Sequence, residues 1–254
     1  MSQQFYVSPE QLMKDRADFA RKGIARGRSV VVISCTEGIA LVAENPSPSL
    51  HKIGEIYDKI AFAAVGKYNE FESLRQAGVR YADVRGYSYD RADVTARGLA
   101  SVYAQSLGTV FTAEHKPFEV ELAVAEVGRH QGDDHLFRLN FDGSIADETD
   151  FVAMGGQADV VSAALAQAWR PDLDFSAALS LAVNALLTDR EGEELTSASL
   201  EVALLERNSE SVRGTRRAFR RLPAADVDQL LNGISGAVGA AEETDKQVGT
   251  NSDG

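Results

Sequence analysis

Short runs of consecutive apolar residues constrain the fold of this chain most. The first run, Val30 to Ile33, consists entirely of β-branched residues, which favour strands. A Thr36-Glu37-Gly38 turn separates it from a second apolar run at residues 39–43. Neither run alternates with polar residues, so we expect a hairpin whose two strands are buried.

Strands and helices are predicted in alternating clusters along the rest of the chain. A loosely amphipathic helix over residues 10–26, with Pro9 near its first turn, precedes the hairpin. An irregular loop from Asn45 to Pro48 follows the hairpin and leads to short strands at 52–56 and 60–65. The later elements are a helix after Asn69, a helix after Asp90 or Asp93, about three strands from Pro117 onward, a helix pair separated by Pro171 and Asp172, strands at 200–205 and about 216–222, and a short helix at 226–231.

Local signals support three of these elements. Asn69 and Glu72 have the spacing of a helix cap, because a side chain three residues on can reach back to the cap. From Pro117 the apolar period changes to two, which is typical of antiparallel strands. The helix after Asp93 carries an apolar stripe composed of Leu99, Val102, Tyr103, Ser106, Leu107 and Val110.

The connections between strand candidates decide the fold class. Most of them are too short for the crossovers that parallel strands need. We therefore predict an α+β fold built in layers with mostly antiparallel sheets. The 254 residues can form one large domain or two small ones, and the lack of an internal repeat or a Pro-rich linker favours one.

Composition excludes several classes of partner. The chain is 44% hydrophobic and 25% charged, as in ordinary soluble domains, and its formal net charge is −12. Nucleic acids and anionic membranes select clustered basic surfaces, so neither is an expected partner. The charge is uneven along the chain. Residues 1–28 hold six bases and three acids, whereas residues 241–254 hold four acids and one base. We predict that residues 233–254 form a disordered acidic tail.

The single cysteine points to a reducing compartment. Cys35 cannot form an internal disulfide, and no Cys/His spacing typical of zinc sites occurs. The N-terminus lacks the basic start and apolar middle of a signal peptide, and no apolar run approaches the ~20 residues of a membrane span. We expect a cytoplasmic protein. At the end of a buried strand, Cys35 is expected to be an inert thiol rather than a nucleophile.

The usual catalytic motifs are absent from the sequence, which contains no GxSxG, Walker or HExxH pattern. The segment from Arg129 to His135 holds two histidines and two aspartates, but a Gly-Asp turn between strands explains it without a metal. No metal and no cofactor are therefore predicted. Gly155 and Gly156 precede a helix and either bind an anion or form a tight strand-to-helix turn.

A basic run near the C-terminus has two interpretations. It forms either a phosphate patch or the solvent or partner face of an edge strand, and its alternation with Ala218 and Phe219 favours the second. The run consists of Arg213, Arg216, Arg217, Arg220 and Arg221.

Several stretches resemble one protein family in their order and spacing. They are Ser8 to Gln11, Ala20 to Gly27 ahead of the Val30 strand, Gly38 to Glu44, Tyr103 to Glu121 with its Gln105 and Lys116-Pro117-Phe118-Glu119-Val120, the Met154-Gly155-Gly156 turn, and the strand from Leu200. Together they resemble the α subunits of the proteasome core particle, most closely the actinobacterial type. The likeness spans about residues 6 to 232.

The resemblance implies a specific version of the predicted fold. Members of this family form a four-layer αββα sandwich, the fold of N-terminal-nucleophile hydrolases, with two antiparallel sheets face to face and a helix pair on each outer side. It also implies a division of the chain. Residues 1–8 would be a gate segment, residues 9–232 the α-type domain, and residues 233–254 the tail.

The resemblance implies that this chain is not itself the catalyst. In the sister β subunits an exposed N-terminal threonine is the nucleophile, assisted by its own amine and a nearby lysine. Here Arg28-Ser29 stands where that threonine pair begins, and Ile60 lies about where the lysine falls. The alternative is a β-type or other N-terminal-nucleophile hydrolase that exposes Ser29 after cleavage.

In the family, seven α subunits form each outer ring of a four-ring barrel and stack on seven catalytic β subunits. The helix from Pro9 to Arg26 resembles the helix that lines the ring entrance. Phe5, Tyr6, Val7, Ser8 and Pro9 would then form the gate and its base. The alternative is a frayed terminus.

Lys52 matches the family lysine in the pocket between neighbouring α subunits, where the C-terminal tail of a regulator docks. Its ammonium would pair with the tail carboxylate. Gly27 and Gly66 match the pocket glycines, whose missing side chains admit the tail backbone. The implied partners are β subunits, other α subunits, and either the hexameric ATPase that feeds pupylated proteins or an ATP-independent ring activator.

Overall fold

The structure is a computed structural model and describes residues 8–190, 192–208 and 217–232. The elements follow in the order α1 (Pro9–Ile24), β1 (Val30–Cys35), β2 (Gly38–Glu44), β3 (Ile53–Tyr57), β4 (Ile60–Gly66), α2 (Tyr68–Ser88), α3 (Ala96–Ala113), β5 (Val120–Glu126), β6 (His135–Leu139), β7 (Ile145–Glu148), β8 (Phe151–Met154), α4 (Ala158–Ala168), α5 (Phe175–Leu186), β9 (Leu200–Glu206) and β10 (Phe219–Arg221). Single 3-10 turns occur at Arg91–Asp93 and Gln131–Asp133, and residues 224–232 are helical.

The ten strands form two five-stranded sheets. One sheet has the order β10-β9-β2-β1-β8 and the other the order β3-β4-β5-β6-β7. Every neighbouring pair is antiparallel. The predicted hairpin is β1 and β2, with Val30 opposite Ala43, and it lies inside its sheet between β8 and β9. Both hairpin strands are completely buried, as the unbroken apolar runs predict.

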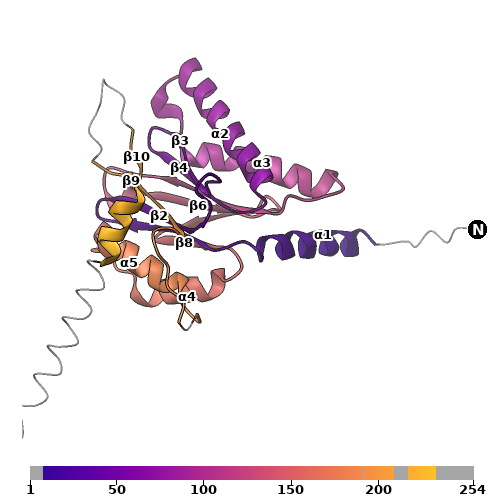
Figure 1. Cartoon of the computed structure of the whole chain (residues 1–254). Helices are drawn as coiled ribbons and strands as arrows, with labels where there is room; N and C mark the ends of the chain where they lie inside the picture. The colour runs from indigo at the N-terminus through magenta and orange to yellow at the C-terminus, as the bar shows by residue number, and fades with distance from the viewer. Residues whose placement is uncertain (1–7, 191, 209–216, 233–254) are drawn as a thin grey trace, which may run out of the picture.

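Three apolar clusters define four layers. In β1, Val30 and Val32 belong to a cluster between the two sheets, whereas Val31 and Ile33 pack with residues of α4 and α5. On the second sheet, a third cluster joins its outer face to α2 and α3. Figure 1 shows the same arrangement, with α2 and α3 on one outer side and α4 and α5 on the other. The prediction of an α+β, four-layer αββα sandwich is confirmed.

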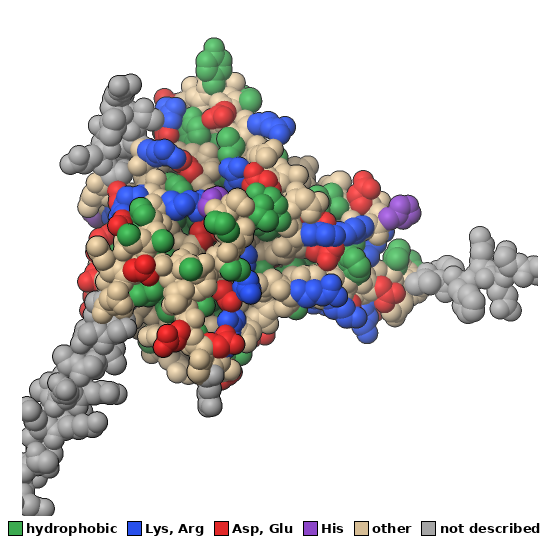
Figure 2. Space-filling model, viewed as in Figure 1, with side chains coloured by type: hydrophobic (Ala, Val, Ile, Leu, Met, Phe, Trp, Pro, Cys, Tyr) green, Lys and Arg blue, Asp and Glu red, His purple; other side chains and the backbone are tan. Residues whose placement is uncertain are grey.

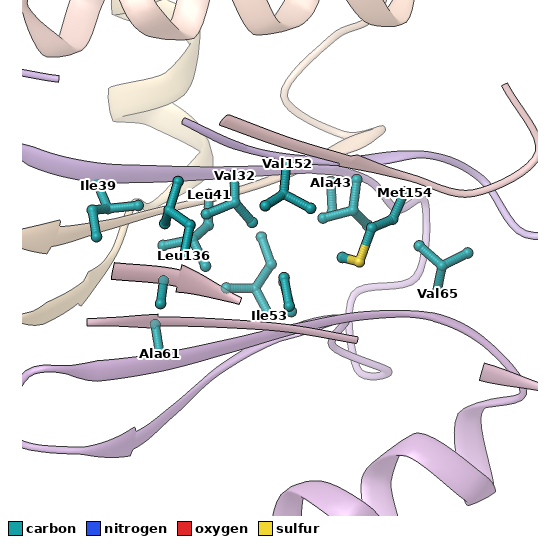
Figure 3. Packing of buried hydrophobic residues seen from close by; sticks show 14 of the residues in the cluster. Val32, Ile39, Leu41, Ala43, Ile53, Ala61, Val65, Leu136, Val152 and Met154 are labelled. Atoms are coloured by element: carbon teal, nitrogen blue, oxygen red, sulfur yellow. The ribbon is translucent and has the colours of Figure 1, made fainter. Parts of the chain in front are cut away.

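The central cluster combines large and small side chains. Figure 3 shows Val32, Leu41 and Val152 on one sheet packed toward Ile53 and Ala61 on the other. Because of its period-two pattern, β5 places alternate side chains on two buried faces. Val120, Leu122 and Val124 pack under α2 and α3, whereas its alanines face the other sheet. Burial on both faces explains why the strands carry so few polar residues.

Helix α1 extends away from the sandwich (Figure 1). Ser8 caps it, because its hydroxyl accepts a hydrogen bond from the Gln11 amide at 3.2 Å, and Pro9 is its first residue. Only Ala20 and Ile24 of the helix are fully buried. Arg16 adds a second attachment, since its guanidinium donates to the carbonyls of Phe111 and Thr112 at 2.7 and 3.0 Å, in the last turn of α3.

Three local predictions were wrong. Asn69 does not cap α2, which begins at Tyr68 directly after β4 and has no side-chain cap. Glu72 binds Arg75 instead of reaching back. In α3 the buried residues are Ala96, Leu99, Ala100, Tyr103 and Leu107. Ser106 is exposed because it lies beside the helix face that packs on the sheet, not on it. The central strand group has four members rather than about three, since β7 and β8 are too short to give a clear period.

The predicted gate residues Phe5, Tyr6 and Val7 and the predicted tail at 233–254 lie outside the described residues. Within the described ranges, no helix is long and apolar enough to cross a membrane.

Candidate functional site

An open cavity of about 280 Å³ lies where the start of β1, the end of β2 and the end of β4 meet. Gly27, Lys52 and Gly66, which are far apart in the sequence, all line it. The loop from Asn45 to Ser47 lines it too. The fold therefore brings the three predicted pocket residues together.

Lys52 provides the cationic group of this cavity. Its ammonium donates to the backbone carbonyls of Arg28 at 2.7 Å and Glu44 at 3.1 Å. An ammonium has three N–H groups, so one donor remains for a further acceptor. The two carbonyls fix the ammonium at the cavity without neutralising its charge.

The carboxylate of Glu44, whose backbone carbonyl accepts from the ammonium, is already paired with other cations. Glu44 accepts from Arg28 Nε at 3.0 Å and from Arg190 Nη1 at 2.9 Å. Burial lowers the pKa of Lys52 from its ordinary 10.5 to about 8; the charges of Glu44 and Glu201 oppose this shift and that of Arg28 adds to it. Among the residues that the structure describes, Lys52 is therefore a desolvated cation without a carboxylate partner for its ammonium.

The two glycines line the cavity at positions where a side chain would meet neighbouring backbone and side-chain atoms. Gly66 has φ +111°, and a Cβ there would lie 1.9 Å from the Glu119 carbonyl oxygen. A Cβ on Gly27 would lie 2.5 Å from Val65 Cγ1 and 3.3 Å from the Gly66 amide nitrogen. A side chain at Gly66 would strain the backbone and collide with β5, and one at Gly27 would collide with Val65.

One wall of the cavity is apolar. Tyr68 and Phe71 from the start of α2 line it, with their rings in edge-to-face contact and their centroids 5.2 Å apart. Leu50 from the opposite loop also lines it and is 47% exposed. A cation beside an apolar wall suits a ligand that carries a carboxylate next to apolar side chains.

The base of the predicted gate lies on α1, away from this cavity. Of the five predicted residues, Ser8 and Pro9 lie in the described part of the chain, as the cap and first residue of the helix. Helix α1 carries Lys14, Arg21 and Lys22, all exposed, and Figure 2 shows basic side chains gathered along this helix. Four of the six bases of residues 1–28 therefore lie on a projecting helix, and Arg26 and Arg28 follow it.

The predicted hydrolase alternative depends on Ser29. This residue is 2% exposed, and its carbonyl accepts from the Glu44 amide at 3.1 Å next to the β1–β2 pairing. The carbonyl of the preceding Arg28 accepts from Lys52. Ile60, at the position expected for a catalytic lysine, is 1% exposed at the start of β4.

Other candidate residues have structural partners. Cys35 is fully buried, and burial raises the pKa of its thiol to about 11, as expected for an inert thiol. Gly155 has φ +109° and its amide donates to Glu121 at 3.3 Å, which is a tight strand-to-helix turn. In the 129–135 segment, Asp133 contacts the His130 amide at 3.3 Å and Asp134 pairs with Arg207 at 2.6 Å.

The basic run lies on an edge strand, as its alternation predicts. Of its five arginines, Arg213 and Arg216 lie outside the described residues. Arg220 and Arg221 belong to β10 at the edge of its sheet. Arg217, Arg220 and Arg221 pair with Glu55, Glu206 and Glu201, so each described arginine of the run has a carboxylate partner.

Sequence reasoning missed two residues that organise the cavity. Arg190 reaches Glu44 from the segment after α5, at a sequence distance of 146 residues, and no spacing rule predicts such a contact. Glu201 accepts from the Lys52 amide at 2.9 Å. Its only signal was a lone acid in the otherwise apolar stretch Leu200-Glu201-Val202-Ala203-Leu204-Leu205.

Comparison with known proteins agrees with the fold. The family model described as "Proteasome subunit" matches residues 24–205. The chain is 77% identical over 232 residues to the proteasome subunit alpha of Arthrobacter sp., covering 91% of this chain and 99% of that protein. It is 61% identical over 240 residues to the proteasome subunit alpha of Kineococcus radiotolerans, covering 92% and 99%. The chain therefore belongs to the proteasome subunit family and is an α-type member of it.

Proposed function

We propose that this chain is a non-catalytic subunit of the outer rings of a proteasome core particle. Seven copies form each outer ring and stack on rings of catalytic β subunits. The chain gates the entrance of the barrel and docks the C-terminal tails of a hexameric ATPase or a ring activator. Its role is then in the degradation of proteins, including pupylated ones, in the cytoplasm.

One observation carries the docking part of the proposal, namely the free donor of Lys52 in a cavity with an apolar wall. The ammonium is held by two carbonyls, and the Glu44 carboxylate is occupied by Arg28 and Arg190. A peptide that ends in a carboxylate supplies the missing anion, and its last side chains can pack on Tyr68 and Phe71.

The docking proposal is tested with Lys52→Ala in a particle assembled with its β subunits. We expect the barrel to assemble, as checked by native mass spectrometry, and activator-stimulated degradation to be lost. Lys59→Ala, which removes an exposed lysine on the turn between β3 and β4, is the matched control. Unchanged stimulation in Lys52→Ala would show that the cavity is not the docking site.

The gate is tested by deleting residues 1–7. This deletion keeps Ser8, so the cap of α1 and the helix remain intact. If the deleted segment closes the entrance, basal peptide hydrolysis by the assembled particle rises, whereas hydrolysis by free β subunits does not change. A flat basal rate would contradict the gate.

The competing function is an N-terminal-nucleophile hydrolase that starts at Ser29. It requires cleavage between Arg28 and Ser29, which removes α1 together with Gly27 from the cavity. The burial of Ser29 and the apolar residue at position 60 support the non-catalytic proposal. Intact mass of the purified chain tests it, because loss of the first 28 residues would favour the hydrolase.

A further inference from the structure

Glu201 is a buried carboxylate that several parts of the chain share. It lies on β9 and is 7% exposed. One oxygen accepts from the side-chain amide of Asn45 at 2.8 Å and from the Lys52 backbone amide at 2.9 Å. The other accepts from the Ile53 amide at 3.3 Å, and His51 Nδ1 and the Arg221 guanidinium also contact it. A carboxylate has about four acceptor sites, so Glu201 is saturated.

These contacts lie at both ends of one connection. Residues 45–52 carry the chain from β2 in one sheet to β3 in the other, without regular structure. Asn45 begins the connection, and Lys52 ends it. Asn45 also donates to the Leu50 carbonyl at 2.7 Å, which closes the loop on itself. Glu201 therefore holds the first and last residues of the loop that forms one side of the cavity.

The contact between Glu201 and Lys52 fixes the residue that carries the ammonium of the cavity. Glu201 binds its backbone amide, and on the other side the Lys52 carbonyl accepts from Ala64 at 3.0 Å in β4. The backbone of Lys52 is thus fixed from both sheets. Its side chain starts from this fixed point and reaches the carbonyls of Arg28 and Glu44.

We propose that Glu201 is a positioning residue of the docking cavity, which fixes the 45–52 loop so that the Lys52 ammonium meets an incoming carboxylate. This inference rests on the proposed docking function. Glu201 also acts through its charge, because it favours the protonated form of Lys52 and so opposes the lowering of its pKa by burial. Replacing the carboxylate removes the anchor and this charge together.

Several charged groups affect the pKa of the Lys52 ammonium, and their effects must be separated from that of Glu201. Glu44 and Glu201 favour the charged form of Lys52, and Arg28 disfavours it. Arg190 binds Glu44, and both His51 and Arg221 bind Glu201. His51 contacts the Glu201 carboxylate directly, so His51→Gln is measured in parallel.

The experiment measures binding of acetyl-Gly-Leu-Tyr-Leu, with a free carboxylate or as its C-terminal amide, to the particle assembled with β subunits. The apolar residues of this probe match the wall formed by Tyr68, Phe71 and Leu50. Binding is followed by competition against a fluorescent copy of the acid peptide between pH 6.5 and 9.5. We expect Glu201→Gln to bind the acid about tenfold more weakly and to lose binding at lower pH than the unmodified particle.

Two further variants separate position from charge. Asn45→Ala loosens the same loop but leaves the Glu201 charge, so it weakens binding of the acid without moving the pH at which binding is lost. It also tests the positioning role if Glu201→Gln does not assemble. Glu206→Gln, on the same strand but paired with Arg220 away from the cavity, binds like the unmodified particle.

The outcomes distinguish the two proposals. If the unmodified particle binds the acid and the amide equally, the docking function itself fails. If it prefers the acid and Lys52→Ala removes this preference, docking holds. The inference about Glu201 is then overturned if Glu201→Gln keeps both the affinity and the pH dependence. If the Glu201→Gln particle does not assemble, the inference is overturned when Asn45→Ala binds the acid as tightly as the unmodified particle.

Discussion

The two ends of the β1–β2 hairpin each contain a buried ionic network, but only one of them is closed. At the end near Ser34, Arg207 pairs with Asp134 through two contacts of 2.6 and 3.0 Å, and their side chains are 6% and 0% exposed. The guanidinium also donates to the carbonyls of Thr36, Cys35 and Gly128. All five of its N–H donors have partners.

At the end near Val30, the cation is less satisfied. Within the described part of the chain, the Lys52 ammonium has two carbonyl acceptors and no carboxylate partner, and it lines an open cavity. The saturated network ties the β5–β6 loop to the first sheet and has nothing left to offer a ligand. The unsaturated one sits beside space and an apolar wall. The difference indicates that the first end stabilises the sandwich and that the second is available for binding.

The largest effect should come from breaking the closed network. Asp134→Ala leaves Arg207 buried without its carboxylate, and we expect a loss of about 3–5 kcal/mol in the free energy of unfolding. Chemical denaturation of the isolated chain measures it. The double variant Asp134→Leu with Arg207→Met, which leaves no buried charge, should recover most of the loss. If Asp134→Ala costs less than about 1 kcal/mol, the closed network is not a stabilising one.

The open network should respond to pH in binding. Burial lowers the Lys52 pKa to about 8, so the ammonium is charged below that pH and neutral above it. A carboxylate binds the charged form, so affinity for the acid peptide is constant below about pH 8 and then falls about tenfold per pH unit. Lys52→Arg, which stays charged, should remove this dependence. A flat profile for the unmodified particle would contradict the role of the ammonium.

Removing the charge of Lys52 should not weaken the fold. The lowered pKa means that the unfolded chain binds a proton on Lys52 more tightly than the folded chain does, so the charged form opposes folding below about pH 10.5. We expect Lys52→Met to leave the free energy of unfolding at pH 7 unchanged or raise it by up to about 1 kcal/mol. Thermal unfolding of the isolated chain measures it. A clear loss of stability in Lys52→Met would show that the ionic networks at both ends of the hairpin stabilise the fold.

The smallest effect should come from the exposed pair at the sheet edge. The side chains of Arg220 and Glu206 are 48% and 33% exposed, so solvent screens their attraction. Arg220→Ala should change the free energy of unfolding by less than about 0.5 kcal/mol. This variant calibrates the comparison, because a large loss here would mean that ionic contacts stabilise this chain irrespective of burial.

Local patterns predicted the elements well where one interaction dominates. The β-branched run at Val30 gave a buried strand, and Ser8 with Pro9 gave the start of α1. The Asn69 cap failed because β4 continues directly into α2, and chain continuity sets the helix start there. Strands β7 and β8 have only four residues each, too few for a period to stand out.

The candidate site was predicted only in part. Lys52, Gly27 and Gly66 were found through the family resemblance and not through their spacing. Their cavity depends on Arg190 and Glu201, which lie 146 and 149 residues from the groups they bind. Such pairs form because β9 lies beside β2 and both sheets meet at the 45–52 loop. Strand order is a property of the folded chain, and no local pattern encodes it.

The sequence by itself determined the layered α+β class, the buried hairpin and the excess of bases in residues 1–28. These follow from apolar periodicity and charge counts, which act over a few neighbouring residues. The tertiary structure alone decided which cation is saturated. Arg207 and Lys52 each stand apart from other Lys and Arg residues in the sequence. The packing of distant strands gives partners to all five N–H donors of Arg207, whereas among the described residues it leaves one donor of Lys52 without an acceptor. That difference arises because hydrogen-bond partners of buried charges come from the whole fold.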